Sequence, residues 1–435
     1  MALSGWFVLL VLAGLVPVIA IGDLAALWAW LAIVVALGAI DLLLAGSPRA
    51  LRLERSLPPR VRLGEPAASR ITLTNAGRRT VRGLARDAWS PSARPLPSRI
   101  AVSVPAGESR TVTTTLRPFR RGSRPAGDIT IRAFGPMRLV ARQATIALPG
   151  ELLVLPAFHA RKHLPSRLAR LRELDGATSL MHRGQGTEFD SLRDYVRGDD
   201  VRSIDWRASA RRSTAPTPEL VVRTWRPERD RRVILVVDTG RAAAARVGDE
   251  TRLDTGYETA LLLGALASAA GDRVDLLLAD RRVRGRVQGA AGPELLPRMV
   301  EAMARVEPEL IEPDWAALPG LVRSVTTQRS LVVIATTPEA PEAARSLLGV
   351  LPELSRKHLV LIAAVADPEL REVRRQRARL GEVYRAAAAE RAIADQRRLA
   401  EAVSRLGGEL LAAAPAELPP AVADRYLAYK AAGRL

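Results

Sequence analysis

The sequence predicts a multidomain chain with three parts: an N-terminal transmembrane helical hairpin, an all-β sandwich and a doubly wound α/β domain. Two almost uncharged apolar runs open the sequence, and short β-prone runs separated by turn residues follow them. Apolar strand runs then alternate with helical stretches to the end. With 435 residues, of which 48% are hydrophobic and 26% charged, the chain is long and apolar enough for two or three folded domains.

Residues 1–47 have the composition of a membrane segment. Residues 3–21 carry no charge, and residues 24–46 carry only Asp41. At a helical rise of about 1.5 Å per residue, each run can cross a hydrocarbon core of roughly 30 Å. We therefore predict two transmembrane helices, joined at Gly22-Asp23. A cleaved signal peptide is the alternative, but its basic start is missing and a second apolar run follows.

Basic residues set the predicted orientation of this segment. Arg49, Arg52 and Arg55 directly follow the second apolar run, whereas the hairpin tip holds only Asp23. The positive-inside rule then places everything from residue 48 onward in the cytoplasm. We expect Asp41 to be a helix-end acid near water, in preference to a hydrogen bond across the hairpin.

Residues 48–157 are predicted to form the β-sandwich. Several runs alternate polar and apolar residues, and turn residues such as Asn75-Ala76-Gly77 and Pro105-Ala106-Gly107 interrupt them. Residues 48–150 contain 20 arginines and five acidic residues, a net charge of +15. This charge suggests a spacer apposed to an anionic membrane leaflet, or a generic basic surface without lipid contact.

Residues 231–435 are predicted to form the α/β domain, after a linker at 158–230. Buried strands are expected in four continuous apolar runs, at 233–237, 274–278, 331–334 and 359–362. Helical stretches lie between them and after them, at 257–270, 293–305, 341–348, 369–405 and 419–435. This alternation predicts a parallel sheet covered by helices on both faces.

Several chemistries lack their motifs. None of the three lysines follows a glycine, so there is no phosphate-binding P-loop, and no serine lies in a Gly-x-Ser-x-Gly elbow. The chain has no cysteine and no His-Glu-x-x-His, which excludes the common zinc sites; His159 and His163 are assigned to the linker. Aromatic residues make up only 4%, and no recognition motif for nucleic acid is present.

The most distinctive segment is 184–211, within the linker. It opens with a Gly-x-Gly turn and reaches Gly198-Asp199-Asp200, where an acid can cap a helix predicted over 200–211. Its charged residues form either an ion-pair network or, with Glu188, Asp199 and Asp205 as general acid and base, a hydrolase site. The distinctive residues of the segment are Gly184, Gly186, Glu188, Phe189, Leu192, Arg193, Tyr195, Gly198, Asp199, Asp200, Arg202, Ile204, Asp205, Trp206, Ser209, Ala210 and Arg211.

This segment closely resembles the signature of the bacterial family called domain of unknown function 58, and the resemblance extends over nearly the whole chain. It implies that the α/β domain is similar to a von Willebrand factor type A domain. It also implies a non-enzymatic adaptor or co-chaperone of the bacterial inner membrane, with a MoxR-type AAA+ ATPase as protein partner. No cofactor is implied.

In a type A domain, the loop after the first strand carries Asp-x-Ser-x-Ser, whose oxygens help to hold a divalent cation. Here the corresponding residues are Asp238-Thr239-Gly240-Arg241-Ala242, with glycine and alanine at the serine positions. Too few oxygen ligands remain for Mg²⁺, so we expect no metal and propose that Arg241 replaces its charge. Thr336 follows another strand run at the same expected edge.

Three functional hypotheses follow. In the first, a partner docks at the crevice beyond the carboxyl ends of the strands, around Asp238, Thr239, Arg241 and Thr336. In the second, the chain is the carboxylate-dependent hydrolase described above. In the third, the basic β domain is a scaffold that binds anionic lipid, with a salt-sensitive affinity.

Overall fold

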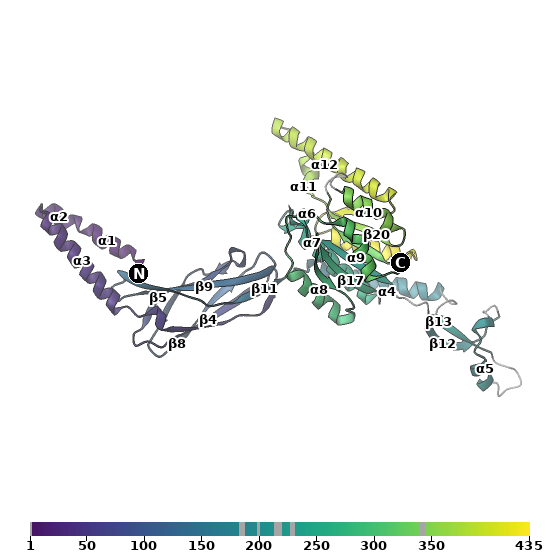
Figure 1. The fold of residues 1–435 in the computed structure, drawn as a ribbon, viewed down its shortest axis with the longest axis horizontal. Coiled ribbons are helices and arrows are strands. Elements are labelled where there is room, and N and C mark those ends of the chain that lie inside the picture. Colours follow the sequence, from purple (N-terminus) through teal and green to yellow (C-terminus); the bar gives the residue numbers. More distant parts are fainter. Residues whose placement is uncertain (1, 182–187, 198–200, 213–219, 227–230, 339–343) are drawn as a thin grey trace. The chain divides into compact units, whose positions relative to one another are not determined.

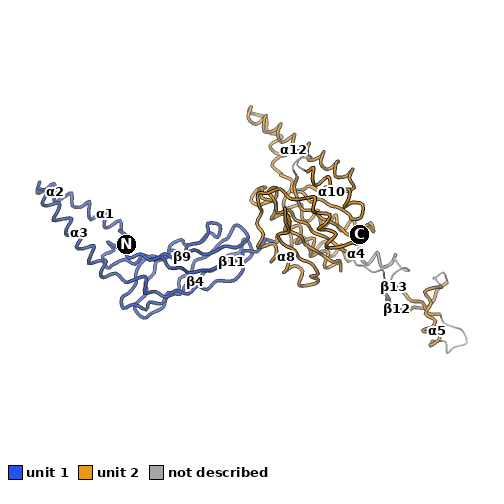
Figure 2. The backbone as a smooth tube through the Cα atoms, viewed as in Figure 1, with its two compact units in different colours: residues 1–157 blue, residues 158–435 orange. Residues whose placement is uncertain are grey.

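The computed structural model describes the whole chain except residues 1, 182–187, 198–200, 213–219, 227–230 and 339–343. The chain divides into two compact units, residues 1–157 and 158–435 (Figure 2). The first unit contains apolar helices and antiparallel sheets, and the second contains a mostly parallel sheet with helices (Figure 1). The antiparallel sheet region and the later α/β content predicted from the sequence are therefore confirmed.

The apolar N-terminal region forms α1 (Gly5–Ala13), α2 (Leu15–Ile21) and α3 (Leu24–Leu44). By length and composition, one described helical segment can cross a membrane: Leu24–Ala50, with 27 residues and a mean hydropathy of 2.3. The apolar stretch Gly5–Ile21 is shorter, so the prediction of two spanning helices stays a prediction. One such span close to the N-terminus is compatible with an anchor or with a signal sequence.

The two arms of this hairpin pack against each other. The indole Nε1 of Trp30 donates a hydrogen bond of 3.0 Å to the carbonyl of Leu10. A Cβ at Gly14, where α1 ends, would overlap the Trp30 ring, so only glycine allows this close approach. The hairpin is thus held by a polar contact as well as by apolar packing.

Two sheets form the rest of the first unit. The seven-stranded sheet runs β1 (Ala2–Leu3), β10 (Val140–Ile146), β9 (Gly122–Phe134), β11 (Glu151–Leu155), β3 (Arg60–Arg62), with β5 (Val81–Trp89) paired to β9 and β7 (Ile100–Val104) paired to β5. The four-stranded sheet runs β2 (Leu51–Ser56), β4 (Ala67–Asn75), β8 (Ser109–Leu116), β6 (Pro95–Leu96). Pairing is antiparallel except between β11 and β3. Leu73 and Ile131, from different sheets, share one buried core.

Asp41 joins α3 to the seven-stranded sheet, and the expectation that it lies near water is wrong. Its side chain is fully buried and accepts hydrogen bonds from the backbone N–H groups of Met137, Leu139 and Val140, at 2.8, 2.8 and 3.0 Å. Met137 and Leu139 lie between β9 and β10, and Val140 is the first residue of β10. A Cβ at Gly135 would overlap the Asp41 carboxylate. The helix end and the sheet therefore form one packed body.

Arg55, one of the arginines that set the predicted orientation, is also buried. Its guanidinium donates to both carboxylate oxygens of Asp87, at 2.8 and 3.0 Å, and to the hydroxyl of Ser69. The side chains of Arg55 and Asp87 are only 3% and 2% exposed. Because its charge is neutralised inside the unit, Arg55 contributes little to the basic surface.

The second unit contains a six-stranded sheet in the order β18 (Val283–Val287), β17 (Arg273–Ala279), β14 (Arg232–Asp238), β19 (Leu331–Ala335), β20 (Leu359–Val365), β21 (Glu409–Ala413). All neighbours are parallel except β17 and β18. In β14, Ile234 and Val236 point to one face and Leu235 and Val237 to the other, so both faces need cover.

Helices cover both faces of this sheet (Figure 1). The face of Ile234 packs against α9 (Leu318–Val325), α10 (Arg345–Ser355) and α12 (Leu380–Arg405). The face of Leu235 packs against α7 (Arg252–Ala269), which in turn contacts α8 (Leu295–Ala304) and α13 (Leu418–Ala431). The short helix α11 (Glu369–Val373) precedes α12. The predicted helix at 257–270 begins five residues earlier because the Thr251 side chain caps it by accepting from the Asp254 N–H.

The segment at 158–230, predicted to be a linker, contains several helices and strands in its described part. It contains η3 (His159–His163), α4 (Leu164–Met181), β12 (Glu188–Asp194), η4 (Val201–Ser203), α5 (Trp206–Arg212) and β13 (Val221–Arg226). β12 and β13 pair as an antiparallel ribbon. The continuous helix predicted over 200–211 is wrong, because Asp205 interrupts it and starts a new helix.

Candidate functional site

The candidate site lies at the carboxyl ends of β14 and β19. The chain runs from β14 to β17 on one side and later returns to β19 on the other, so the direction of winding changes between these two strands. Loops diverge at such a point and leave a crevice that ligands commonly occupy. Asp238 is the last residue of β14, and Thr336 follows β19.

Asp238 is buried and held by two donors. The hydroxyl of Thr336 donates to its Oδ2 at 2.7 Å, and the backbone N–H of Gly240 donates to its Oδ1 at 2.7 Å. The residue is 2% exposed. Burial raises the pKa of Asp238, and the two hydrogen bonds only partly oppose this effect. The structure thus brings Asp238 and Thr336 together, as expected from the sequence.

Thr239 faces a different carboxylate, that of Asp280, which is not among the site residues predicted from the sequence. Its hydroxyl donates to Asp280 at 2.9 Å, and Asp280 also accepts from Arg284 at 3.1 Å and from the backbone N–H of Arg282. Burial acts to raise the pKa of Asp280, but these hydrogen bonds outweigh it and the pKa is lowered. The position of Asp280 in the sequence indicates that it lies at the same edge, because Asp280 directly follows β17 and Asp238 ends the neighbouring strand β14.

Arg241 does not replace a metal charge beside Asp238, contrary to expectation. Its side chain is 72% exposed and lies 3.8 Å from the carboxylate of Glu312. It starts the short helix α6 (Arg241–Ala244), which directs the side chain toward solvent. The Arg241 guanidinium is therefore a surface charge at the carboxyl edge of the sheet.

The residues at Asp238 do not fit a divalent cation. A Cβ at Gly240 would lie 2.7 Å from the carbonyl oxygen of Ile311, so no hydroxyl-bearing side chain fits there. The hollow lined by Asp238 and Thr336 measures about 10 Å³, room for about one water molecule. In the described part of the chain, no three His, Asp or Glu side chains are placed to hold a metal ion.

The loop at 307–314 covers part of this edge. The N–H of Glu309 donates to the carbonyl of Thr239 at 2.9 Å, and the carbonyl of Ile311 accepts from the N–H of Arg241 at 2.8 Å. Leu310, between these two anchors, is 79% exposed. The backbone therefore holds an apolar side chain in solvent, next to the exposed charges of Arg241 and Glu312.

A second hollow, of about 240 Å³, lies in the same unit beside η3. The buried Glu258 carboxylate accepts hydrogen bonds from the N–H groups of His159 and Ala160, at 3.1 and 2.8 Å. Burial and the nearby charge of Glu258 raise the pKa of Glu250, which lines the same hollow. The pair His159 and His163, assigned to the linker from the sequence, therefore lines a hollow that also holds the carboxylates of Glu250 and Glu258.

In the described part of the 184–211 segment, hydrogen bonds of Asp205 and Ser209 hold the chain together. Oδ1 of Asp205 accepts from the N–H groups of Arg207 and Ala208, each at 3.0 Å, and Oδ2 accepts from Arg223 at 2.8 Å. The hydroxyl of Ser209 receives the N–H of Val221, so α5 is tied to β13. These hydrogen bonds lower the pKa of Asp205, and the bond from the Ala208 N–H contributes most. A carboxyl group with a lowered pKa is a poor general acid.

The other residues of this segment are spread over several surfaces. Ile204 is buried and bridges to Val222, whereas Trp206 is 67% exposed. Leu192, Arg202, Ala210 and Arg211 are exposed, and Arg193 and Tyr195 are half-buried. Gly184, Gly186, Gly198, Asp199 and Asp200 lie outside the described residues, and of Glu188 and Phe189 only the backbone, in β12, is described. The convergence of Glu188, Asp199 and Asp205 therefore stays a prediction.

Comparison with known families and proteins agrees with the resemblance of this segment. The model of the family described as "Protein of unknown function DUF58" matches residues 191–388. Uncharacterized proteins of Mycobacterium bovis and Mycobacterium tuberculosis are 27% identical over 187 residues, 42% of this chain. The match spans 56% of each relative, so the chain covers about half the length of the curated relatives it matches.

Among solved structures, similarity is found to the CARDB domain of the PF1109 protein from Pyrococcus furiosus. The identity is 18% and the TM-score 0.19, over 24% of this chain and 91% of that one. A β-glucosidase from Listeria innocua matches with 16% identity and a TM-score of 0.18, over 24% of this chain and 16% of the enzyme.

Proposed function

We propose that the chain is a membrane-anchored adaptor without catalytic activity of its own, whose α/β unit docks a protein partner at the carboxyl edge of its sheet. The observation that carries the proposal is the strand order. With β14 as the first strand, the order is third, second, first, fourth, fifth and sixth, and the third strand is antiparallel. This order supports a von Willebrand factor type A-like domain, and it favours the edge at Asp238 and Thr336 as the proposed binding position.

The surface of this edge suits a protein better than a small molecule. The hollow at Asp238 has room for about one water molecule, whereas Leu310, Arg241 and Glu312 are exposed where the loop at 307–314 bonds to Thr239 and Arg241. An exposed leucine with charged neighbours has the composition of an interface centre with a polar rim. The backbone bonds of the loop at 307–314 fix this surface before a partner arrives, which lowers the entropic cost of binding.

The partner we propose is a MoxR-type AAA+ ATPase, because the 184–211 segment resembles a family that is often encoded beside such ATPases. We further propose that α1 and α2 form a second membrane-crossing arm beside α3, in a bacterial inner membrane. Arg49 and Arg52 are exposed after α3, which supports a cytoplasmic position for both units.

Co-purification tests this proposal. Full-length chain is extracted in gentle detergent from cells that contain the ATPase, with and without nucleotide. We expect the wild type to retain the ATPase, and Leu310→Asp and Arg241→Glu each to lower the retained amount at least tenfold. Arg329→Glu is the matched control, because Arg329 is exposed just before β19, at the opposite edge of the sheet. Absence of the ATPase from the wild-type eluate, or equal loss with Arg329→Glu, refutes the proposal.

A further inference from the structure

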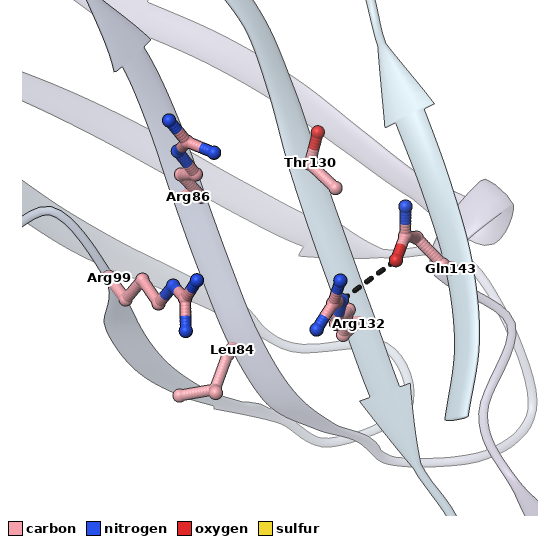
Figure 3. A pocket seen from close by; sticks show the side chains of 6 residues that line it. All are labelled: Leu84, Arg86, Arg99, Thr130, Arg132 and Gln143. Carbon is pink, nitrogen blue, oxygen red and sulfur yellow. Dashed lines mark hydrogen bonds between the residues drawn. The ribbon is translucent and has the colours of Figure 1, made fainter. Parts of the chain in front are cut away.

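Three arginines gather on the outer face of the seven-stranded sheet. Arg86 on β5 lies opposite Thr130 on β9, and Arg132 on β9 lies opposite Leu84. Arg99 directly precedes β7, the neighbour of β5. These side chains share one face because residues two apart on a strand point the same way. Figure 3 shows them, with Gln143 on β10, around a hollow of about 190 Å³.

The charge of this hollow is uncompensated. Of the six residues that line it, three are arginines and none is acidic. Arg132 is oriented by a hydrogen bond of 2.7 Å from its Nε to Gln143, while Arg86 and Arg99 are exposed. Asp128 is exposed two residues before Thr130 on the same face of β9, and in the described structure it forms no ion pair with the three arginines.

Like charges on neighbouring strands repel, so such a cluster lowers the stability of the sheet unless an anion binds. The interior of the same unit shows the opposite arrangement, since Arg55 is fully paired with Asp87. Guanidinium groups gathered around one hollow suit a phosphate, whose oxygens can accept several charge-assisted hydrogen bonds at once. The chemistry of the hollow therefore selects a phosphate group.

Its position indicates where that phosphate comes from. Arg132 precedes Gly135 by three residues, a rise of about 10 Å along the strand. Gly135 lies against Asp41, in the last turn of α3. The headgroup layer is about 5–7 Å thick on each side of a bilayer, and the field of its charges extends about 8 Å further. At about 10 Å from Gly135, Arg132 falls within this range, and Arg86, which pairs with Thr130 two residues farther along β9, lies about 7 Å farther away.

We propose that Arg86, Arg99 and Arg132 form a binding site for the phosphate of an anionic lipid headgroup. The site lies beside the end of α3 because Asp41 fixes the sheet to that helix. A bound headgroup offsets part of the positive charge of the three arginines and adds a second, electrostatic attachment to the apolar one. The inference rests on the membrane anchoring proposed above, but not on the docking of a partner.

Native mass spectrometry of the full-length chain in detergent tests the site. The probes are phosphatidylglycerol, phosphatidylethanolamine and inorganic phosphate. We expect the wild type to bind phosphatidylglycerol at least tenfold more tightly than phosphatidylethanolamine. The variant Arg86→Gln, Arg99→Gln, Arg132→Gln should lose this preference. The control variant Arg52→Gln, Arg70→Gln, Arg117→Gln removes the same charge at exposed positions outside the hollow and should keep it.

Two results would overturn the proposal. Equal phosphatidylglycerol binding by the two triple variants would show that the attraction depends on net charge alone. Displacement of phosphatidylglycerol by an equal concentration of inorganic phosphate would assign the site to free phosphate. Thermal unfolding checks that both triple variants fold. If the variant of Arg86, Arg99 and Arg132 still retains the ATPase, the loss of lipid binding is independent of the docking proposal. A single variant, Arg86→Gln, with Arg86→Lys for comparison, repeats the test with a smaller change.

Discussion

Asp41 and Asp238 are two buried carboxylates with different settings. Asp41 accepts hydrogen bonds from three backbone N–H groups where the chain enters β10, whereas Asp238 accepts one backbone N–H and one hydroxyl. Backbone donors are fixed by the fold, while a threonine hydroxyl can rotate to another acceptor. Asp41 therefore holds α3 to the sheet, whereas Asp238 joins the ends of the neighbouring strands β14 and β19.

The largest effect is expected for Asp41→Ala, which leaves the N–H groups of Met137, Leu139 and Val140 without their acceptor. We expect the free energy of unfolding to fall by at least about 3 kcal/mol. Asp23→Ala is the matched control, because Asp23 is an exposed cap of α3 whose loss costs about 1 kcal/mol. Thermal unfolding of the full-length chain in detergent measures both. Equal losses would show that Asp41 has no special role in joining α3 to the sheet.

A smaller loss is expected for Asp238→Ala, about 1–2 kcal/mol, because it removes only two hydrogen bonds together with an unfavourable buried charge. Asp238→Asn keeps an acceptor for Gly240 and should cost less than Asp238→Ala. The same unfolding measurement compares the two variants. If Asp238→Ala is as damaging as Asp41→Ala, the contrast between the two carboxylates is wrong.

The dependence of stability on pH gives the smallest effect. Because burial raises the pKa of Asp238 in the folded chain, the folded state binds its proton more tightly than the unfolded state. Its contribution is therefore fully present below the unfolded pKa of about 4 and is lost as pH rises through the folded pKa. Wild type should lose stability relative to Asp238→Asn as pH rises from about 4 toward 8. A constant difference between the two unfolding temperatures would contradict this.

The sequence alone predicts much of the second unit. Continuous apolar runs identify β14, β17, β19 and β20, and parallel strands bring their carboxyl ends together. That reasoning places Asp238 and Thr336 at one edge, although 98 residues separate them. The prediction works because it depends on strand period and direction rather than on individual side-chain contacts.

Features that depend on distant partners could not be predicted. Asp41 meets a turn 96 to 99 residues later, and Arg241 faces Glu312 rather than the neighbouring Asp238. Arg55 follows the apolar N-terminal helices and is predicted from the sequence to be an orientation signal, but its partner Asp87 lies 32 residues away on another strand. Local composition does not encode such pairings.

Cross-linking in intact membranes tests the docking of a partner most directly. A photoreactive residue is placed at position 310, on the loop over the carboxyl edge, or at position 329, at the opposite edge. We expect position 310 to capture a MoxR-type ATPase and position 329 not to capture it. Capture from 329 alone, or no ATPase adduct from 310 in membranes that contain the ATPase, would contradict the docking proposal.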